Sequence, residues 1–206
     1  MKTIALLFML PACVWAEQTV IDDYEDARDD HFWPELYEDA GQTIYCNIEF
    51  DGREGMTVEH VYAAQWMAEA VGCPNRQNCD STLFHHAEAD LHNLWPANGR
   101  INSSRGDKLF SEIPGEDQRR FEDICPDYER TSGAAAVIEP QDSVKGDIAR
   151  SIFYMVFFYD FPLHGMGPML LRWHEADPPD AEEIRRNDEI EDIQDTRNPF
   201  IDIAAD

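Results

Sequence analysis

Two short stretches of this chain decide its fold and carry its chemistry: Val58-Glu59-His60-Val61 and Asp90-Leu91-His92-Asn93-Leu94-Trp95-Pro96-Ala97-Asn98-Gly99-Arg100-Ile101-Asn102. Residues 56–62 and 90–94 predict two short strands. The Asn-Gly pair that follows Trp95-Pro96 predicts a turn that leads into a helix near residues 100–110. A carboxylate, an imidazole and a side-chain amide would then meet where one hydrated metal ion can be held.

The rest of the pattern predicts an α+β domain of mixed order, mainly helical, with short strands among the helices. Residues 43–50 alternate apolar and polar side chains and predict a strand, and Asp51-Gly52 predicts the turn after it. Aromatic residues between 24 and 37 predict a helix packed on the core. Helices are also expected at residues 143–158, capped by Ser143, at residues 169–175, and at residues 181–195, which would bury Ile184, Ile190 and Ile193.

Residues 1–16 have the features of a secretory signal peptide. Lys2 precedes an apolar run at residues 4–10, and Val14-Trp15-Ala16 ends in a small residue suited to cleavage before Glu17. The run is too short to cross a bilayer. Leu10-Pro11-Ala12-Cys13 also resembles a lipoprotein signal, although Pro suits its second position poorly. We therefore expect an exported protein, periplasmic or secreted, without a membrane span, in which residues 17–206 form one domain.

Four cysteines remain after removal of residues 1–16, an even number for an oxidising compartment. Cys73 and Cys79 flank the turn-forming Pro-Asn-Arg-Gln-Asn and would close a small loop, leaving Cys46 to pair with Cys125. The two other pairings stay open at this stage. A metal site built from these cysteines is disfavoured because the chain has no Cys-x-x-Cys.

The charge balance is strongly acidic, with 42 Asp and Glu against 16 Lys and Arg and a net charge of −26. Such a balance argues against binding a polyanion, because that affinity normally comes from Lys and Arg. The acids, however, crowd residues 22–54 and 175–195. Between residues 91 and 110 the single acid is Asp107, against Arg100, Arg105 and Lys108. We interpret the acidic stretches as a solvated surface rather than a site for a basic partner.

Several motifs together resemble the endonuclease I family of exported bacterial nucleases, which carry the ββα-metal (His-Me finger) motif. The resemblance covers about residues 43–201. Its motifs are Val58-Glu-His-Val61, residues 87–102, the Arg76-Gln-Asn-Cys79 loop, Lys145-Gly-Asp-Ile-Ala-Arg150 with the residues that follow it, residues 187–194, and the closing Arg197-Asn-Pro-Phe200. The central block is the most specific of these. The family implies a strand ending in Glu-His, a long loop, a second strand with Asp-Leu-His-Asn, and a helix that presents Asn.

The resemblance also implies a mechanism by matching positions. Glu59 and Asn102 would ligate one Mg²⁺, which Mn²⁺ or Ca²⁺ can replace in binding. His60 would be the general base, Arg76 would hold the phosphate, and Glu88 would orient His60. The metal would stabilise charge on the leaving 3′ oxygen. The implied reaction is endonucleolytic cleavage of DNA, and of RNA as a further substrate, with little sequence preference and 5′-phosphate ends, by a monomer.

The chain departs from the family pattern at two places. Ala63 stands where the family commonly has Pro, and Ser103-Ser104-Arg105 stands where it often has Gly-Asp-Arg. Neither change removes an expected ligand, so they bear on loop geometry and substrate contacts.

Three alternatives remain beside this interpretation. His85, His86 and His92 suggest zinc, but no His-Glu-x-x-His occurs. The rival function is a non-catalytic acidic secreted protein of the same fold that binds calcium or a basic partner. Four cations are candidates to line a nucleic-acid groove, with surface solubility as the alternative: Arg105, Lys108, Lys145 and Arg150.

Overall fold

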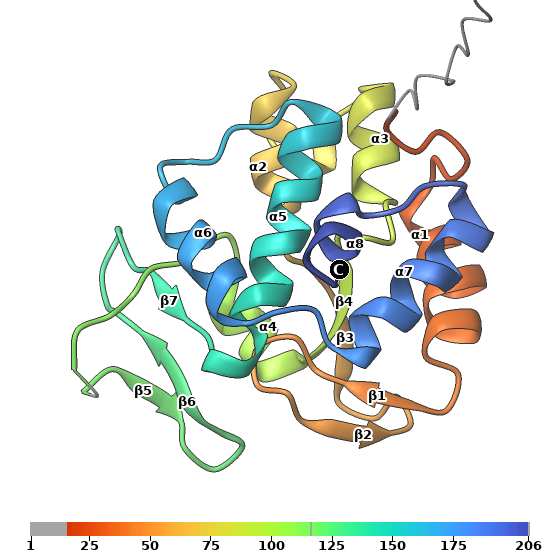
Figure 1. Cartoon of the computed structure of the whole chain (residues 1–206). Coiled ribbons are helices and arrows are strands. Elements are labelled where there is room, and N and C mark those ends of the chain that lie inside the picture. Colours follow the sequence, from red (N-terminus) through yellow and green to blue (C-terminus); the bar gives the residue numbers. More distant parts are fainter. Residues whose placement is uncertain (1–15, 116, 206) are drawn as a thin grey trace, which may run out of the picture.

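The computed structural model describes residues 16–115 and 117–205 as an α+β fold, in which short antiparallel sheets lie among helices (Figure 1). The fold class therefore agrees with the sequence. The expected signal peptide lies outside the described residues, apart from Ala16. None of the helices in the described part of the chain has the length and apolarity needed to span a bilayer.

The central hairpin joins β3 (Met56–His60) to β4 (Leu94–Asn98), with His60 opposite Leu94 in an antiparallel register. Helix α4 (Gly99–Arg105) follows β4 directly, and its first turn is capped by the Asn98 side chain, which accepts from the Arg100 amide at 3.0 Å. The chain thus runs strand, strand, helix with no intervening loop after β4, and α4 packs against the hairpin.

The chain between the two strands returns to β4 through a tight turn at residues 90–93. The expected strand over residues 90–94 is wrong except at Leu94, because Asp90 to Asn93 close this turn with their own hydrogen bonds. Asn93 then clamps the chain just beyond β3: its Oδ1 accepts from the Tyr62 amide at 2.7 Å and its Nδ2 donates to the Tyr62 carbonyl at 3.1 Å. This clamp fixes where β3 ends.

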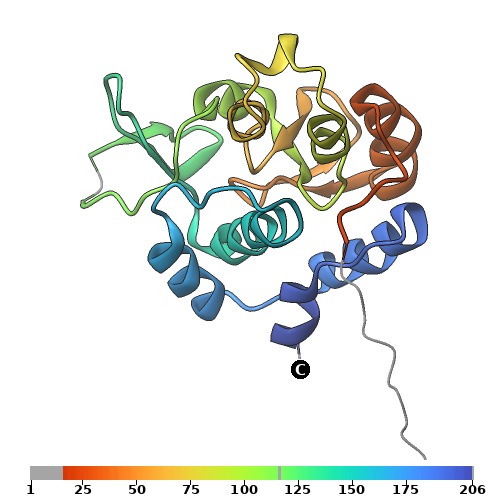
Figure 2. The ribbon, with the colours of Figure 1, turned by 90° about the horizontal axis from the view of Figure 1, so that it is seen from above.

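Helices cover the hairpin on several sides, and α5 (Lys145–Tyr159) lies near the middle, with β3 and β4 on one side and α6 to α8 on the other (Figure 2). Of the four residues whose helical spacing predicted a buried face, Ile148, Ile152 and Met155 of α5 are fully buried and Val156 is partly buried. The other helical segments are α1 (Tyr24–Asp26), the π-helical η1 (Ala27–Leu36), α2 (Ala64–Ala70), the 3₁₀ turn η2 (Arg76–Asn78), α3 (Thr82–Glu88), the 3₁₀ turn η3 (Asp142–Val144), α6 (Gly167–Ala176), α7 (Ala181–Gln194) and α8 (Pro199–Ala205).

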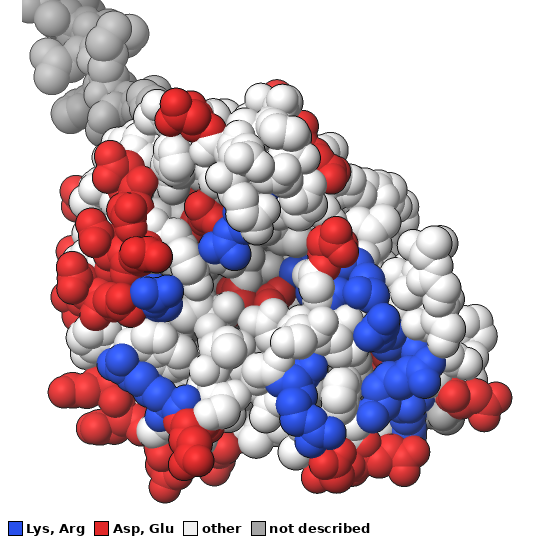
Figure 3. All heavy atoms as spheres, turned by 180° about the vertical axis from the view of Figure 1, so that it is seen from behind, with Lys and Arg blue, Asp and Glu red and all other residues white. Residues whose placement is uncertain are grey.

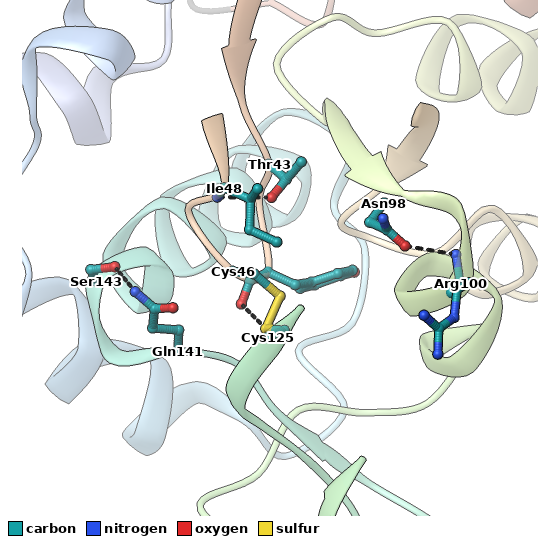
Figure 4. Close-up of a disulfide and its surroundings, with 9 residues drawn as sticks. Thr43, Cys46, Ile48, Asn98, Arg100, Cys125, Gln141 and Ser143 are labelled. Atoms are coloured by element: carbon teal, nitrogen blue, oxygen red, sulfur yellow. Dashed lines mark hydrogen bonds between the residues drawn. A yellow bond between two sulfur atoms is a disulfide. The ribbon is translucent and has the colours of Figure 1, made fainter. Parts of the chain in front are cut away.

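A three-stranded antiparallel sheet stands to one side of the helices (Figure 1). It is formed by β5 (Arg119–Phe121), β6 (Cys125–Arg130) and β7 (Ile138–Glu139), and no sequence pattern predicted it. A disulfide fastens β6 to the core through Cys46 and Cys125 (Figure 4), and a second joins Cys73 to Cys79. This is the connectivity that the cysteine spacing favoured.

The helix expected near residues 100–110 ends at Arg105. Three further local expectations are wrong. Residues 43–50 are not one strand, because the chain turns back between β1 (Ala40–Gln42) and β2 (Glu49–Asp51), and the Thr43 hydroxyl accepts from the Ile48 amide within that turn (Figure 4). Ser143 does not cap α5, since it lies inside η3, and its hydroxyl accepts from Gln141. Ile184 is exposed, whereas Ile190 is buried as expected and Ile193 partly so.

A buried polar network ties the 90–93 turn to the helices around it. The Asp90 carboxylate accepts from the hydroxyls of Tyr154 at 3.0 Å and Tyr159 at 2.7 Å and from Gln194 Nε2 at 2.9 Å. His92 Nε2 donates to the Thr196 carbonyl at 2.9 Å, and burial lowers the pKa of His92 to about 3. The turn that starts β4 is therefore fixed by hydrogen bonds from both α5 and α7.

The two disulfides should differ in their effect on stability. Cys46 and Cys125 are 79 residues apart, whereas Cys73 and Cys79 are six apart. Because loop-closure entropy grows with loop length, replacing the first pair by Ser should lower the free energy of unfolding by about 4 kcal/mol, and replacing the second by about 2 kcal/mol. Urea unfolding of both variants measures this. A larger loss from the six-residue loop would contradict the expectation.

The buried His92 should make stability fall in mild acid. In the unfolded chain the pKa of His92 is about 6.5, whereas in the folded chain it is about 3. Between these values the unfolded chain binds a proton at His92 and the folded chain does not. The free energy of unfolding therefore falls as the pH drops from 7.5 towards 3. At pH 5 one such histidine costs about 2 kcal/mol. His92→Gln should remove that part of the decline, and urea unfolding at pH 7.5 and pH 5 measures it. Each protein is its own control at pH 7.5, and an unchanged pH dependence in the variant would refute the prediction.

Candidate active site

A polar cavity of about 330 Å³ opens at the end of β3, between the start of α2, η2 and α4. Figure 3 shows this face hollowed, with acidic atoms in the depth of the hollow and basic side chains around it. Four of the residues expected at the site line the same cavity: Glu59, His60, Arg76 and Asn102. The fold therefore brings together residues from three separate segments of the chain.

Glu59 forms the buried wall of this cavity. Its Oε1 accepts from Tyr45 OH at 2.7 Å and from Arg105 at 2.6 Å. Burial raises the pKa of Glu59, and the charge of Arg105 opposes that rise. With Oε1 occupied by two donors, the second carboxylate oxygen of Glu59 is left for a ligand.

Arg105, at the end of α4, contacts the end of β3, and its side chain is only 1% exposed. Besides Glu59, its guanidinium donates to the carbonyls of His60 at 2.7 Å and Val61 at 2.6 Å. Arg105 is therefore a structural residue of the site. The expectation that it lines an open nucleic-acid groove does not fit this burial, because its two terminal nitrogens donate to Glu59 and to backbone oxygens, although Arg105 forms part of the cavity lining.

His60 is held in one tautomer by the chain at the end of α3. Its Nε2 lies 2.9 Å from the Glu88 carbonyl, which can only accept, so Nε2 carries the proton and Nδ1 keeps its lone pair. Burial, together with the charges of Arg76 and Arg105, lowers the pKa of His60 to about 3. His60 is thus a neutral imidazole at physiological pH that can accept a proton at Nδ1.

Arg76 reaches the cavity from η2, inside the loop that the Cys73–Cys79 disulfide closes. Its Nε donates to the carboxylate of Glu88, and its guanidinium lies 5.0 Å from the centre of the Tyr24 ring. Glu88 thus has two roles: its backbone carbonyl orients His60 and its side chain orients Arg76. The remaining guanidinium donors of Arg76 are suited to an anion in the cavity.

Asn102 projects from the first turns of α4 towards β3. Its Nδ2 donates to Thr57 Oγ1 at 3.0 Å and to the Val58 carbonyl at 3.1 Å. Because a carbonyl can only accept, the Val58 contact fixes which end of the amide is nitrogen and leaves Oδ1 as a free acceptor.

Glu59 and Asn102 together offer one carboxylate and one amide oxygen. That donor set fits a hard divalent cation such as Mg²⁺, which keeps several waters and takes one or two protein ligands. It does not fit zinc, which prefers nitrogen and sulfur donors. Within residues 16–115 and 117–205, no three or more His, Cys, Asp or Glu side chains gather as they would around a metal.

Comparison with known proteins agrees with the motifs around this cavity. The family model described as endonuclease I matches residues 17–205. The chain belongs to the endonuclease I family. A periplasmic deoxyribonuclease of Aeromonas hydrophila is 29% identical over 195 residues, which are 81% of this chain and 81% of that protein. An endonuclease-1 of Buchnera aphidicola is 30% identical over 69% of the chain and 60% of the relative. An extracellular ribonuclease of Bacillus amyloliquefaciens is 36% identical over 55% of the chain, and the match spans 43% of that ribonuclease.

The other expected cations of this endonuclease I family member lie in different surroundings. Arg150 is fully buried and pairs with Glu183 at 2.5 Å, so it joins α5 to α7 and cannot touch a substrate. Lys145 forms ion pairs with Glu139 and Asp142, both at 2.6 Å, and lines a separate hollow. Lys108 alone of the four stays beside the cavity with no carboxylate partner among the described residues.

Two tyrosines of the site were missed by sequence reasoning. Tyr45 donates to Glu59 from a turn fourteen residues upstream, and Tyr24 packs its ring 4.9 Å from the His60 ring while also contacting Arg76. Tyr24 was expected only as an apolar anchor of its helix. Neither tyrosine belongs to a spaced motif, so no local signal could have placed them at the cavity.

Removal of Arg105 should destabilise the whole domain. Arg105→Met leaves Glu59 as a buried carboxylate without its cation, and such losses amount to about 3–5 kcal/mol of the free energy of unfolding. The matched control is Arg100→Met, whose partner Asp123 forms an exposed pair, and exposed pairs contribute below about 1 kcal/mol. Chemical denaturation of both variants measures the difference. Equal losses would show that the buried pair is not what fixes the site.

Proposed function

We propose that this chain is an exported, metal-dependent endonuclease that hydrolyses phosphodiester bonds with little sequence preference. The observation that carries the proposal is the His60 ring. Its Nε2 is fixed by the Glu88 carbonyl and its basic Nδ1 is kept neutral in the cavity that Glu59, Asn102 and Arg76 also line. Membership of the endonuclease I family supports the same reaction class.

The strand–strand–helix order of β3, β4 and α4 supports assigning this part of the chain as a ββα-metal motif. In such a site some residues of the chain bind the metal ion and others act on the phosphate and the attacking water. Glu59 and Asn102 would hold one Mg²⁺, for which their free oxygens are suited. When bound, that ion supplies positive charge beside the leaving 3′ oxygen.

His60 and Arg76 act on the attacking water and on the phosphate. His60 Nδ1 takes a proton from water as the water oxygen bonds to phosphorus, and the bond between phosphorus and the 3′ oxygen breaks. The leaving 3′ oxygen takes a proton from solvent water, and His60 returns its proton to solvent. Arg76 donates to a nonbridging oxygen and holds the phosphate while its negative charge grows. Glu88 keeps both residues in place. The products are a 5′-phosphate end and a 3′-hydroxyl end.

This mechanism does not distinguish DNA from RNA, because the nucleophile is water and the 2′-hydroxyl takes no part. The names of the relatives include both deoxyribonucleases and a ribonuclease, which supports activity on DNA and on RNA as well. Export is supported by relatives named periplasmic or extracellular and by the two disulfides, which persist in oxidising compartments.

His60→Asn should lower the rate of plasmid cleavage by about 10²–10⁴-fold, because the proton acceptor is lost while the hydrogen bond to the Glu88 carbonyl can be kept.

Glu59→Gln should weaken Mg²⁺ binding, measured by calorimetry, whereas His60→Asn should leave it nearly unchanged. His85→Asn, outside the cavity lining, is the matched control and should cut at the wild-type rate. Cleavage by the wild type that persists in EDTA would overturn the metal dependence, and cleavage by His60→Asn at the wild-type rate would overturn the choice of base.

A further inference from the structure

Three cations on β5, β6 and the turn after α4 differ from most others in this acidic protein. Most described Lys and Arg side chains pair with carboxylates, as Arg119 does with Asp127. Within the described residues, by contrast, Lys108, Arg120 and Arg130 form no ion pair, and their nitrogens donate only to uncharged oxygens. We call these three side chains the arm cations. Their charge is available to a ligand, which is unusual in a chain with 42 acids and 16 bases.

A series of contacts links the arm cations from β5 to the end of α4. Arg120 Nε donates to the Arg130 carbonyl across the β5–β6 pair at 3.0 Å. Arg130 then donates to Ser104 Oγ on α4 at 3.3 Å, and Lys108 Nζ donates to the Arg105 carbonyl at 3.3 Å. Burial and the nearby charge of Arg130 both lower the pKa of Lys108, which agrees with the two cations being neighbours.

This surface continues into the rim of the cavity. Asn102, Arg105 and Gly106 line the cavity from α4 and its C-terminal turn. A side-chain carbon at Gly106 would lie 3.4 Å from Lys108 Nζ, so Lys108 sits directly over that rim. Figure 3 shows basic side chains extending from the hollow towards one edge of this face, whereas the opposite edge is largely acidic.

We propose that Lys108, Arg120 and Arg130 bind the phosphates that flank the scissile phosphate, so that the nucleic-acid backbone runs from the cavity along β5 and β6. The inference rests on the proposed function. These cations are spread over a helix end and a strand pair rather than around one point. That layout fits a polymer with a repeating negative charge. Such contacts position the substrate without reading its sequence.

The arm cations should therefore determine how binding responds to salt. Each phosphate contact releases bound counterions, so the slope of log affinity against log salt falls by about 0.9 for each contact removed from duplex DNA. Arg120→Gln/Arg130→Gln removes two such contacts. Arg172→Gln/Arg185→Gln is the matched control, because it changes the net charge equally but removes cations that Glu112 and Glu182 already neutralise.

The experiment measures binding of a fluorescent duplex of about 20 base pairs by anisotropy, in the His60→Asn background, between about 50 and 200 mM salt. The arm variant should lower the slope by about 2, and the control should keep the parental slope. With His60 restored, the arm variant should raise KM for the duplex by about tenfold with kcat changed less than about twofold. On a dinucleotide, which has no flanking phosphate, the arm variant and the control should differ far less.

Equal salt slopes for the arm variant and the control would overturn the inference. A wild-type protein that binds duplex DNA and single-stranded RNA but cuts neither would overturn the proposed function instead, while the slopes would still decide the role of the arm. Circular dichroism of both double variants checks that each retains the native fold.

Discussion

The buried ion pair between Glu59 and Arg105 is the interaction on which the site depends. Removing two charges from water is costly, and the cost is recovered only when further hydrogen bonds satisfy both groups. Tyr45 and two backbone carbonyls supply most of those bonds, although Arg105 Nε has no hydrogen-bond partner among the described residues. The Arg105 guanidinium also lies 4.9 Å from the centre of the Trp66 ring. The pair joins the last turn of α4 to the last residues of β3. One interaction thus fixes the carboxylate, the direction of the chain at His60 and the helix that carries Asn102.

The electrostatic state of His60 follows from the same arrangement. Burial and the nearby charges of Arg76 and Arg105 act in the same direction, so the pKa of His60 falls to about 3. A base with so low a pKa is weak, but its Nδ1 is unprotonated at every physiological pH. Glu88 keeps Arg76 from pointing elsewhere. The cavity therefore joins a neutral proton acceptor to a positively charged anion site, which suits a reaction in which water attacks a phosphate.

Features of the structure that depend on neighbouring residues along the chain could be predicted from the sequence. Features that depend on contacts between residues far apart in the sequence were missed. The strand that ends at His60, the helix that carries Asn102 and the pairing of the cysteines all had local signals. Arg105 and Arg150 were placed on the surface because an arginine is buried only when its partners lie close in space, and those partners, Glu59 and Glu183, are 46 and 33 residues away. The β5–β7 sheet was missed for a similar reason, since its strands are short and held by a disulfide to a distant turn.

Net charge is a poor guide to substrate in this chain because it sums cations with different tasks. Arg105 and Arg150 form ion pairs with buried carboxylates, and exposed cations such as Arg172 form ion pairs with nearby acidic side chains. What a polyanion meets is the unpaired remainder, and among the described residues three of these cations, Lys108, Arg120 and Arg130, extend from the end of α4 to β5. At physiological ionic strength exposed charges are screened over about 8 Å, so the acidic surface farther away repels the substrate only weakly while cations in direct contact keep their full effect. A net charge of −26 is therefore compatible with a nucleic-acid substrate, provided that the unpaired cations stay next to the site.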